Sequence, residues 1–173
     1  MQFLTFRLHD SLPLAVLEKW KKELAQCSEI EREIVLRERI EKYLDCGYRN
    51  CYLKRAEIAE IVQDALLFHD RAKYQLIAWT IMPNHVHLLL KPIEELGEIE
   101  HSIKSFTANK INKFLNRSGT LWQKEVYDRY IRDFEHYERT VAYIENNPVK
   151  AHLCEKAENW KFGSAYFFKN CEK

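Results

Sequence analysis

The chain has 173 residues, of which 46% are hydrophobic and 31% are charged, and its formal net charge is +1 at pH 7. This length and balance are typical of one globular domain, so we expect a single domain over residues 1–173. No apolar run approaches the roughly eighteen residues of a membrane span, and the N-terminus lacks a signal-peptide layout, so we expect a cytoplasmic protein without a membrane partner. The five cysteines form no C-x-x-C pair, which argues against a zinc ribbon and favours reduced thiols.

The hydrophobic pattern predicts helices and strands along the whole chain. A β-prone run at 3–8 is followed by apolar residues at helical spacing over 14–44, which indicate one or two helices ending at the break 45–50. The elements expected after the break are a helix at 55–69, a strand at 74–81, a turn at 82–84, a strand starting at 85, a helix at 98–115, a strand at 125–132 and a helix at 136–147. The last helix should end near Pro148, because proline disfavours helical geometry in the residue before it.

The order of these elements predicts the fold class. Without the helical insertion at 14–50 and the last helix, the order is β-α-β-β-α-β, which is the ferredoxin-like arrangement of an α+β protein with an antiparallel sheet. Such a sheet has helices on one face and leaves the other face available for a ligand.

The strand that starts at 85 carries two histidines in the stretch MPNHVHLLL. His85 and His87 are at i and i+2, so both rings lie on the same face of the strand. Burying two imidazoles without partners costs roughly 1 to 3 kcal/mol each, so polar groups should lie opposite them. The pair is either half of a metal site or a chance pairing of core histidines.

The last predicted helix supplies candidate partners for the histidines. Tyr143 and Asn147 are at i and i+4 and therefore lie on one helix face. A phenol with a pKa of about 10 is a poor nucleophile unless a metal polarises the group under attack. Tyr143 is thus the candidate nucleophile, with Tyr127 and Tyr130 on the predicted strand as alternatives.

Basic and aromatic residues are interleaved between 102 and 124, without any acidic residue. Such a stretch suits contact with phosphates and stacking on bases. A solvated helix face over a packed core is the favoured explanation for the stretch alone. Trp122 most simply packs in the core, and Arg129 and Arg132 bind phosphate or solvate an edge strand. The candidate DNA-binding residues are Lys104, Lys110, Lys113, Arg117, Trp122, Lys124, Arg129 and Arg132.

Three segments in order, AWTIMPNHVHLLLKP, LWQKEVYDRYIRD and YIENNPVKAHL, resemble the REP-associated tyrosine transposases. These belong to the single-tyrosine HUH nucleases, named for histidine, a hydrophobic residue and histidine. The resemblance covers essentially the whole chain apart from 14–50. It implies that His85 and His87 bind a divalent metal, that Tyr143 is the nucleophile and that Asn147, where related transposases have glutamine, completes the metal site.

The resemblance also implies a reaction. The expected activity is metal-dependent cleavage and transfer of single-stranded DNA through a 5′-phosphotyrosine intermediate, on hairpin-forming repeat DNA and without ATP. We expect Mg²⁺ or Mn²⁺, although two imidazoles also suit Zn²⁺ or Ni²⁺. The expected partner is single-stranded or hairpin DNA. A homodimer is possible, and the residues leave open whether Tyr143 acts in its own subunit.

Two rival functions can be compared with this one. A histidine-triad nucleotide hydrolase needs a third histidine at position 89, where this chain has Leu89. A non-catalytic module that binds single-stranded nucleic acid is the remaining alternative, because ferredoxin-like sheets bind single strands through aromatic side chains. That alternative gives no reason for the histidine pair and Tyr143 to occur together.

Overall fold

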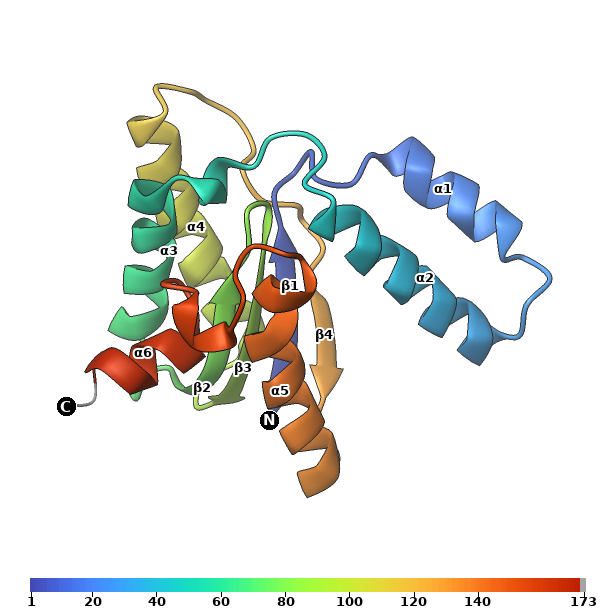
Figure 1. The fold of residues 1–173 in the computed structure, drawn as a ribbon. Helices are drawn as coiled ribbons and strands as arrows, with labels where there is room; N and C mark the ends of the chain where they lie inside the picture. The colour runs from blue at the N-terminus through green and yellow to red at the C-terminus, as the bar shows by residue number, and fades with distance from the viewer. Residues whose placement is uncertain (172–173) are drawn as a thin grey trace.

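A computed structural model describes residues 1–171 of the chain, and Figure 1 shows the fold. The strands are β1 (Gln2–Arg7), β2 (Tyr74–Ile81), β3 (His85–Pro92) and β4 (Tyr127–Tyr130). The helices are α1 (Leu14–Glu23), α2 (Glu29–Asp45), α3 (Ala56–Phe68), α4 (Leu96–Phe114), α5 (Phe134–Lys150) and α6 (Ser164–Cys171), with short 3-10 turns at Tyr52–Lys54 and Ala157–Asn159.

The four strands form one antiparallel sheet in the order β2-β3-β1-β4. β3 and β1 are therefore the central strands, and Thr5 of β1 pairs with His87 of β3. Removal of α1, α2 and the helices from α5 onward leaves β-α-β-β-α-β, so the predicted ferredoxin-like α+β fold is confirmed.

The main core lies between the sheet and the pair α3 and α4, which run side by side on one face (Figure 1). Ile58 and Val62 of α3 and Ile103 of α4 pack there against Leu88 and Leu90 of β3. Alternation along β3 sends His85, His87 and Leu89 to the opposite face. The histidines therefore point away from the main core.

The opposite face carries a smaller apolar cluster under α5. Phe3, Leu89 and Ile144 belong to this cluster, and α5 crosses β2 and β3 above it. Burial of this stripe holds α5 against the sheet, with Tyr137, Val141 and Tyr143 packed along the edge of the cluster. The helix that carries Tyr143 is thus fixed over the face that carries the histidines.

The predicted insertion is a hairpin of two helices, α1 and α2, that projects from the body (Figure 1). α2 begins after Ser28, whose hydroxyl accepts a hydrogen bond from the N–H of Glu31. At the other end of α2, Leu44 is buried, and its carbonyl accepts a 3.0 Å hydrogen bond from the side-chain amide of Asn84. The C-terminal half of α2 is thereby anchored beside the turn that precedes His85.

The tyrosine-bearing helix ends near Pro148 as predicted, three residues beyond the expected bound at 147. α5 continues through Pro148 to Lys150, although proline has no N–H to donate to the preceding turn. The N–H of Ala151 donates to the carbonyl of Asn147 at 3.0 Å, which completes the last turn. His152 follows with a φ of 56°, a left-handed conformation that glycine adopts most easily.

Other predicted boundaries shift by one to three residues. The strand predicted at 125–132 is shorter, because β4 pairs with β1 only from Gln2 to Thr5. Within residues 1–171, none of the helices combines the length and the apolar character needed to cross a membrane.

Candidate metal and nucleophile site

The β2–β3 hairpin positions the two histidines. The turn closes with a 2.8 Å hydrogen bond from the N–H of Met82 to the carbonyl of His85, so β3 begins at His85 itself. Both imidazoles are almost completely buried, with exposed fractions of 1% for His85 and 2% for His87. Their placement on one face, predicted from the i, i+2 spacing, is confirmed by the register.

Each histidine has a polar partner at Nδ1. The side-chain oxygen of Asn84 lies 2.7 Å from Nδ1 of His85, and the hydroxyl of Thr5 lies 2.7 Å from Nδ1 of His87. Because the Asn84 amide nitrogen donates to the Leu44 carbonyl, its oxygen faces His85 and can only accept. His85 therefore carries its proton on Nδ1, and its Nε2 has a free lone pair.

The Nε2 atoms of the two histidines converge to 3.1 Å. Burial lowers the pKa of His85 well below its ordinary value, with further contributions from His87 and Arg7. Burial, then the charges of Lys150 and Arg7, lowers the pKa of His87 to about 3. Both imidazoles are therefore neutral near pH 7, which is the form that binds metals.

This arrangement fits a metal ion. Two nitrogens 3.1 Å apart can bond one ion at metal–nitrogen distances of about 2.0 to 2.1 Å. A metal-binding histidine usually donates its other ring N–H to a nearby oxygen, and here the Asn84 amide oxygen and the Thr5 hydroxyl lie at the two Nδ1 atoms. Among residues 1–171, however, no group of three histidine, cysteine or acidic side chains converges on one point. Any third protein ligand at this point must therefore come from another residue type.

Asn147 is the available side chain of another type. It lies on α5 one turn after Tyr143, it is 1% exposed, and neither its amide oxygen nor its amide nitrogen has a hydrogen-bond partner among the described residues. Buried amides are almost always paired, so the unpaired amide of Asn147 is compatible with a role as a metal ligand. The helical geometry maintained through Pro148 keeps Asn147 on the inner side of α5.

Tyr143 lies against the histidine pair. Its hydroxyl is 3.4 Å from Nε2 of His87, and its ring meets the rings of His87 and Phe3 edge to face. Burial raises the pKa of the Tyr143 phenol, and the nearby carboxylates of Glu41 and Asp45 raise it further. The phenol is protonated at rest and lies beside the two converging nitrogens.

No sequence pattern predicted several of the residues that line this site. Arg37 and Glu41 come from α2 and line the same cavity as Tyr143, a hollow of about 410 Å³. A second cavity of about 210 Å³, between α2 and the sheet, is lined by Arg7, Glu41 and His87. Arg7 has two side-chain nitrogens, Nε and Nη1, without hydrogen-bond partners among the described residues. Only the tertiary placement of the insertion over β1 reveals these residues.

The cavity at Tyr143 is rich in arginine. Arg37, Arg129, Arg132 and Arg139 line it together with His136. Burial and then the charge of Arg129 lower the pKa of His136, Asp133 raises it, and Arg139 and Arg132 lower it further. Of the candidate DNA-binding residues, only Arg129 and Arg132 lie here.

The remaining candidate DNA-binding residues lie elsewhere. Trp122 is 4% exposed and donates a 2.9 Å hydrogen bond to Thr107, so it is a core residue, as packing predicts. The ammonium of Lys104 donates to the carbonyls of Gln123 and Lys124 at 2.6 and 3.0 Å, so it fastens a loop. Lys110, Lys113, Arg117 and Lys124 lie on or after α4, behind the sheet from the histidines.

The two alternative tyrosines are less well placed than Tyr143. Tyr127 pairs with Thr5 and lines the smaller cavity with His87, while its ring meets Phe3 edge to face. Tyr130 is 64% exposed and lines a different groove. Of these three tyrosines, Tyr143 alone has its hydroxyl within hydrogen-bonding distance of a site histidine.

A solved structure shares the fold over almost the entire chain. It is described as a REP-associated tyrosine transposase bound to a REP hairpin, and it aligns with a TM-score of 0.62 and 15% sequence identity, covering 99% of this chain and 79% of that one. At 15% identity this match shows that the fold is shared, and together with the family and the relatives described next it confirms the predicted resemblance.

The sequence comparison identifies the family. The model of the family described as "Transposase IS200 like" matches residues 40–147, so the chain belongs to the IS200-like transposase family. This match includes the histidine pair, Tyr143 and the C-terminal part of α2.

Two curated relatives have names that agree with this family. The REP-associated tyrosine transposase of Escherichia coli K12 is 27% identical over 93 residues, which are 53% of this chain and 54% of that protein. A putative REP-associated tyrosine transposase of Haemophilus influenzae is 24% identical over 106 residues, covering 53% of this chain and 58% of that protein. The chain thus spans about half the length of the curated relatives that it matches.

Proposed function

We propose that the protein is a metal-dependent strand transferase for single-stranded DNA with Tyr143 as its nucleophile. The observation that carries the proposal is the 3.4 Å distance between the Tyr143 hydroxyl and Nε2 of His87 in a single chain. This distance supports action of Tyr143 in its own subunit. Because the solved relative of the same fold is bound to a REP hairpin, we extend the proposal to hairpin-forming DNA.

His85, His87 and Asn147 are the residues that would hold the metal, with Mg²⁺ or Mn²⁺ as the proposed ion. When bound, such an ion supplies Lewis-acid polarisation of the phosphate and neutralises negative charge at the phosphate oxygens. Thr5 and Asn84 hold the imidazoles by their Nδ1 atoms, so both Nε2 atoms keep their direction. This orientation requires no rearrangement of the hairpin.

The chemical step is an exchange of one phosphodiester bond for another. The phenol oxygen of Tyr143 bonds to phosphorus, the bond from phosphorus to the 3′ oxygen breaks, and the DNA strand remains attached through a 5′-phosphotyrosine. The leaving 3′ oxygen takes up a proton as the phenol loses one, so the step is balanced without ATP. Attack by a 3′-OH on the phosphotyrosine reverses the step and joins strands.

We assign roles in proton transfer and in phosphate binding to two neighbouring side chains. Glu41 lines the Tyr143 cavity, its side chain is 18% exposed, and its charge contributes to the raised pKa of the phenol. We assign to its carboxylate the acceptance of the phenol proton as the new bond forms. Arg7 lines the smaller cavity and has two nitrogens free of hydrogen bonds among residues 1–171. We assign to its guanidinium the donation of hydrogen bonds to a phosphate oxygen.

The test is formation of a covalent protein–DNA adduct. A labelled REP hairpin with a single-stranded flank is incubated with the protein and Mn²⁺ and separated on a denaturing gel. We expect an adduct for the wild type that is lost with EDTA and lost in Tyr143→Phe, whereas the control Tyr166→Phe, on α6, retains it. A wild type that binds the hairpin but never forms an adduct contradicts the proposal and indicates the non-catalytic binding module instead.

A further inference from the structure

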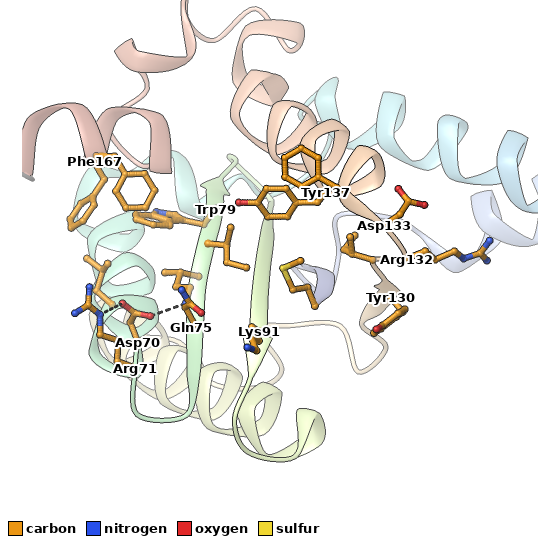
Figure 2. A pocket seen from close by; sticks show the side chains of 17 residues that line it. Asp70, Arg71, Gln75, Trp79, Lys91, Tyr130, Arg132, Asp133, Tyr137 and Phe167 are labelled. Atoms are coloured by element: carbon orange, nitrogen blue, oxygen red, sulfur yellow. Dashed lines mark hydrogen bonds and ion pairs between the residues drawn. The ribbon is translucent and has the colours of Figure 1, made fainter.

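The cavity at Tyr143 adjoins a larger groove at the start of α5. The groove has a volume of about 1020 Å³ and crosses β2 and β3, with Tyr137 of α5 on one side and Phe167 of α6 on the other (Figure 2). Arg132 and Asp133 line both the cavity and the groove. An extended ligand that starts at Tyr143 can therefore pass Arg132 and enter the groove.

Two unpaired arginines lie along this passage. Arg129 and Arg132 are exposed, and neither guanidinium forms an ion pair among the described residues. By contrast, Arg139 pairs with Glu135 at 2.9 Å, and Arg37 lies 3.6 Å from Glu41. Asp133, the acid at the same point, accepts the N–H of His136 as the helix cap. The two free guanidinium groups are thus available for phosphate.

An aromatic pair, with Phe134 exposed and Tyr137 half-buried, follows the arginines. Phe134 is 71% exposed at the first residue of α5, and its ring stacks on Tyr137 at a centroid distance of 5.9 Å and an angle of 24°. Tyr137 supports the inner face of the Phe134 ring and leaves the outer face open. An aromatic face beside a positive groove is how single-stranded nucleic acids are bound without readout of sequence.

We infer that the single-stranded DNA next to the cleaved position follows this path, with phosphates on Arg129 and Arg132 and one base stacked on Phe134. The inference rests on the proposed function, because Tyr143 defines where the path begins. Phosphate contacts and base stacking differ in their salt dependence, since only the former release counterions. The two halves of the path can therefore be tested separately.

The experiment measures binding of a fluorescent REP hairpin, with a single-stranded flank of about ten nucleotides, by anisotropy at several salt concentrations. All variants carry Tyr143→Phe to prevent cleavage. The double variant Arg129→Ala/Arg132→Ala should bind about ten-fold more weakly or worse, and the slope of log affinity against log salt should become shallower by about 1.4, or about 0.7 for each lost contact. Phe134→Ala should also bind about ten-fold more weakly, with the slope unchanged.

Two further variants make the result specific. Phe134→Trp should restore binding, because indole also stacks on bases. Lys21→Ala/Lys22→Ala removes the same charge from exposed positions of α1 and should change affinity by less than about two-fold. Normal binding by Phe134→Ala, or an unchanged salt slope in the double arginine variant, overturns the inference.

The outcome is separable from that of the proposed function. An adduct formed by the wild type, together with normal binding by the path variants, refutes the path and leaves the function standing. Weakened binding by the path variants without any wild-type adduct supports the path and refutes the function.

Discussion

The hydroxyl of Tyr143 lies 3.4 Å from Nε2 of His87, although the two residues are 56 positions apart in the sequence. The same Nε2 atom lies 3.1 Å from Nε2 of His85. The proposed nucleophile and two neutral imidazole nitrogens therefore meet at one point on the sheet face opposite the main core.

Loss of the Thr5 hydroxyl should weaken metal binding. Thr5→Val keeps the shape of the side chain but removes the oxygen 2.7 Å from Nδ1 of His87, so the ring loses its orienting partner. Such partners are worth about 10- to 100-fold in metal affinity. Calorimetric titration with Mn²⁺ should show a loss in that range for Thr5→Val and near-normal affinity for Thr5→Ser. Equal affinity in Thr5→Val and the wild type would show that His87 needs no such support.

Replacement of Asn147 should affect the metal-free and metal-bound proteins differently. In the metal-free protein, Asn147→Leu removes two buried polar atoms without partners, whose burial costs roughly 1 to 3 kcal/mol, so the free energy of unfolding should not fall. With Mn²⁺ present, the variant should gain less stability than the wild type, because a ligand is missing. Thermal unfolding with and without Mn²⁺ measures both effects. A variant that Mn²⁺ stabilises as much as the wild type would exclude Asn147 as a ligand.

Asp45 should make stability depend on pH. Burial raises the pKa of this carboxyl to about 6, so the protonated form is favoured in the folded protein. Its contribution to stability is present below about pH 4, the pKa of an unfolded aspartate, and is lost as the pH rises through 6. Asp45→Asn should therefore be more stable than the wild type at pH 7.5, by about 1 kcal/mol after allowance for solvent screening, and equally stable at pH 4.

Urea unfolding at the two pH values measures this difference. Asp64→Asn, at an exposed position of α3, is the matched control for the change in charge. A wild type whose stability equals that of Asp45→Asn at both pH values would contradict the prediction.

Lys104 should matter for stability and not for DNA binding. Lys104→Met leaves two loop carbonyls, those of Gln123 and Lys124, without their donor, at a cost of about 1 kcal/mol for partly exposed groups. Lys110→Met, which removes the same charge from the same helix, should leave stability nearly unchanged. A loss of hairpin affinity in Lys104→Met, with normal stability, would restore this lysine as a DNA contact.

Local sequence patterns predicted the strands and the placement of His85 and His87 on one face, because side chains alternate along a strand with a period of two residues. Alternation in β3 places His85 and His87 on one face of the sheet, and helical spacing places Tyr143 and Asn147 on one face of α5. The expectation that the Tyr143 face of α5 lies over the histidines rested on the resemblance to a family. No spacing rule connects a strand to a helix 56 residues later.

The remaining parts of the site depend on tertiary contacts. Glu41 belongs to an amphipathic helix like many others, and only the anchoring of Leu44 to Asn84 brings it to Tyr143. The basic stretch at 102–124 lies on the other side of the sheet, where its charges alternate with core residues of α4, so its contact with DNA stays a prediction. The helix that carries Tyr143 extends three residues beyond the bound predicted at 147, although proline disfavours helical geometry in the residue before it.

The most direct test of the account is to identify the tyrosine that becomes linked to DNA. The protein is incubated with a REP hairpin and Mn²⁺, the adduct is digested with trypsin and nuclease, and the nucleotide-bearing peptide is sequenced by mass spectrometry. We predict that the nucleotide is on Tyr143, which touches His87. A nucleotide on Tyr127 or Tyr130 instead would contradict the account, because β4 and not α5 would then carry the nucleophile.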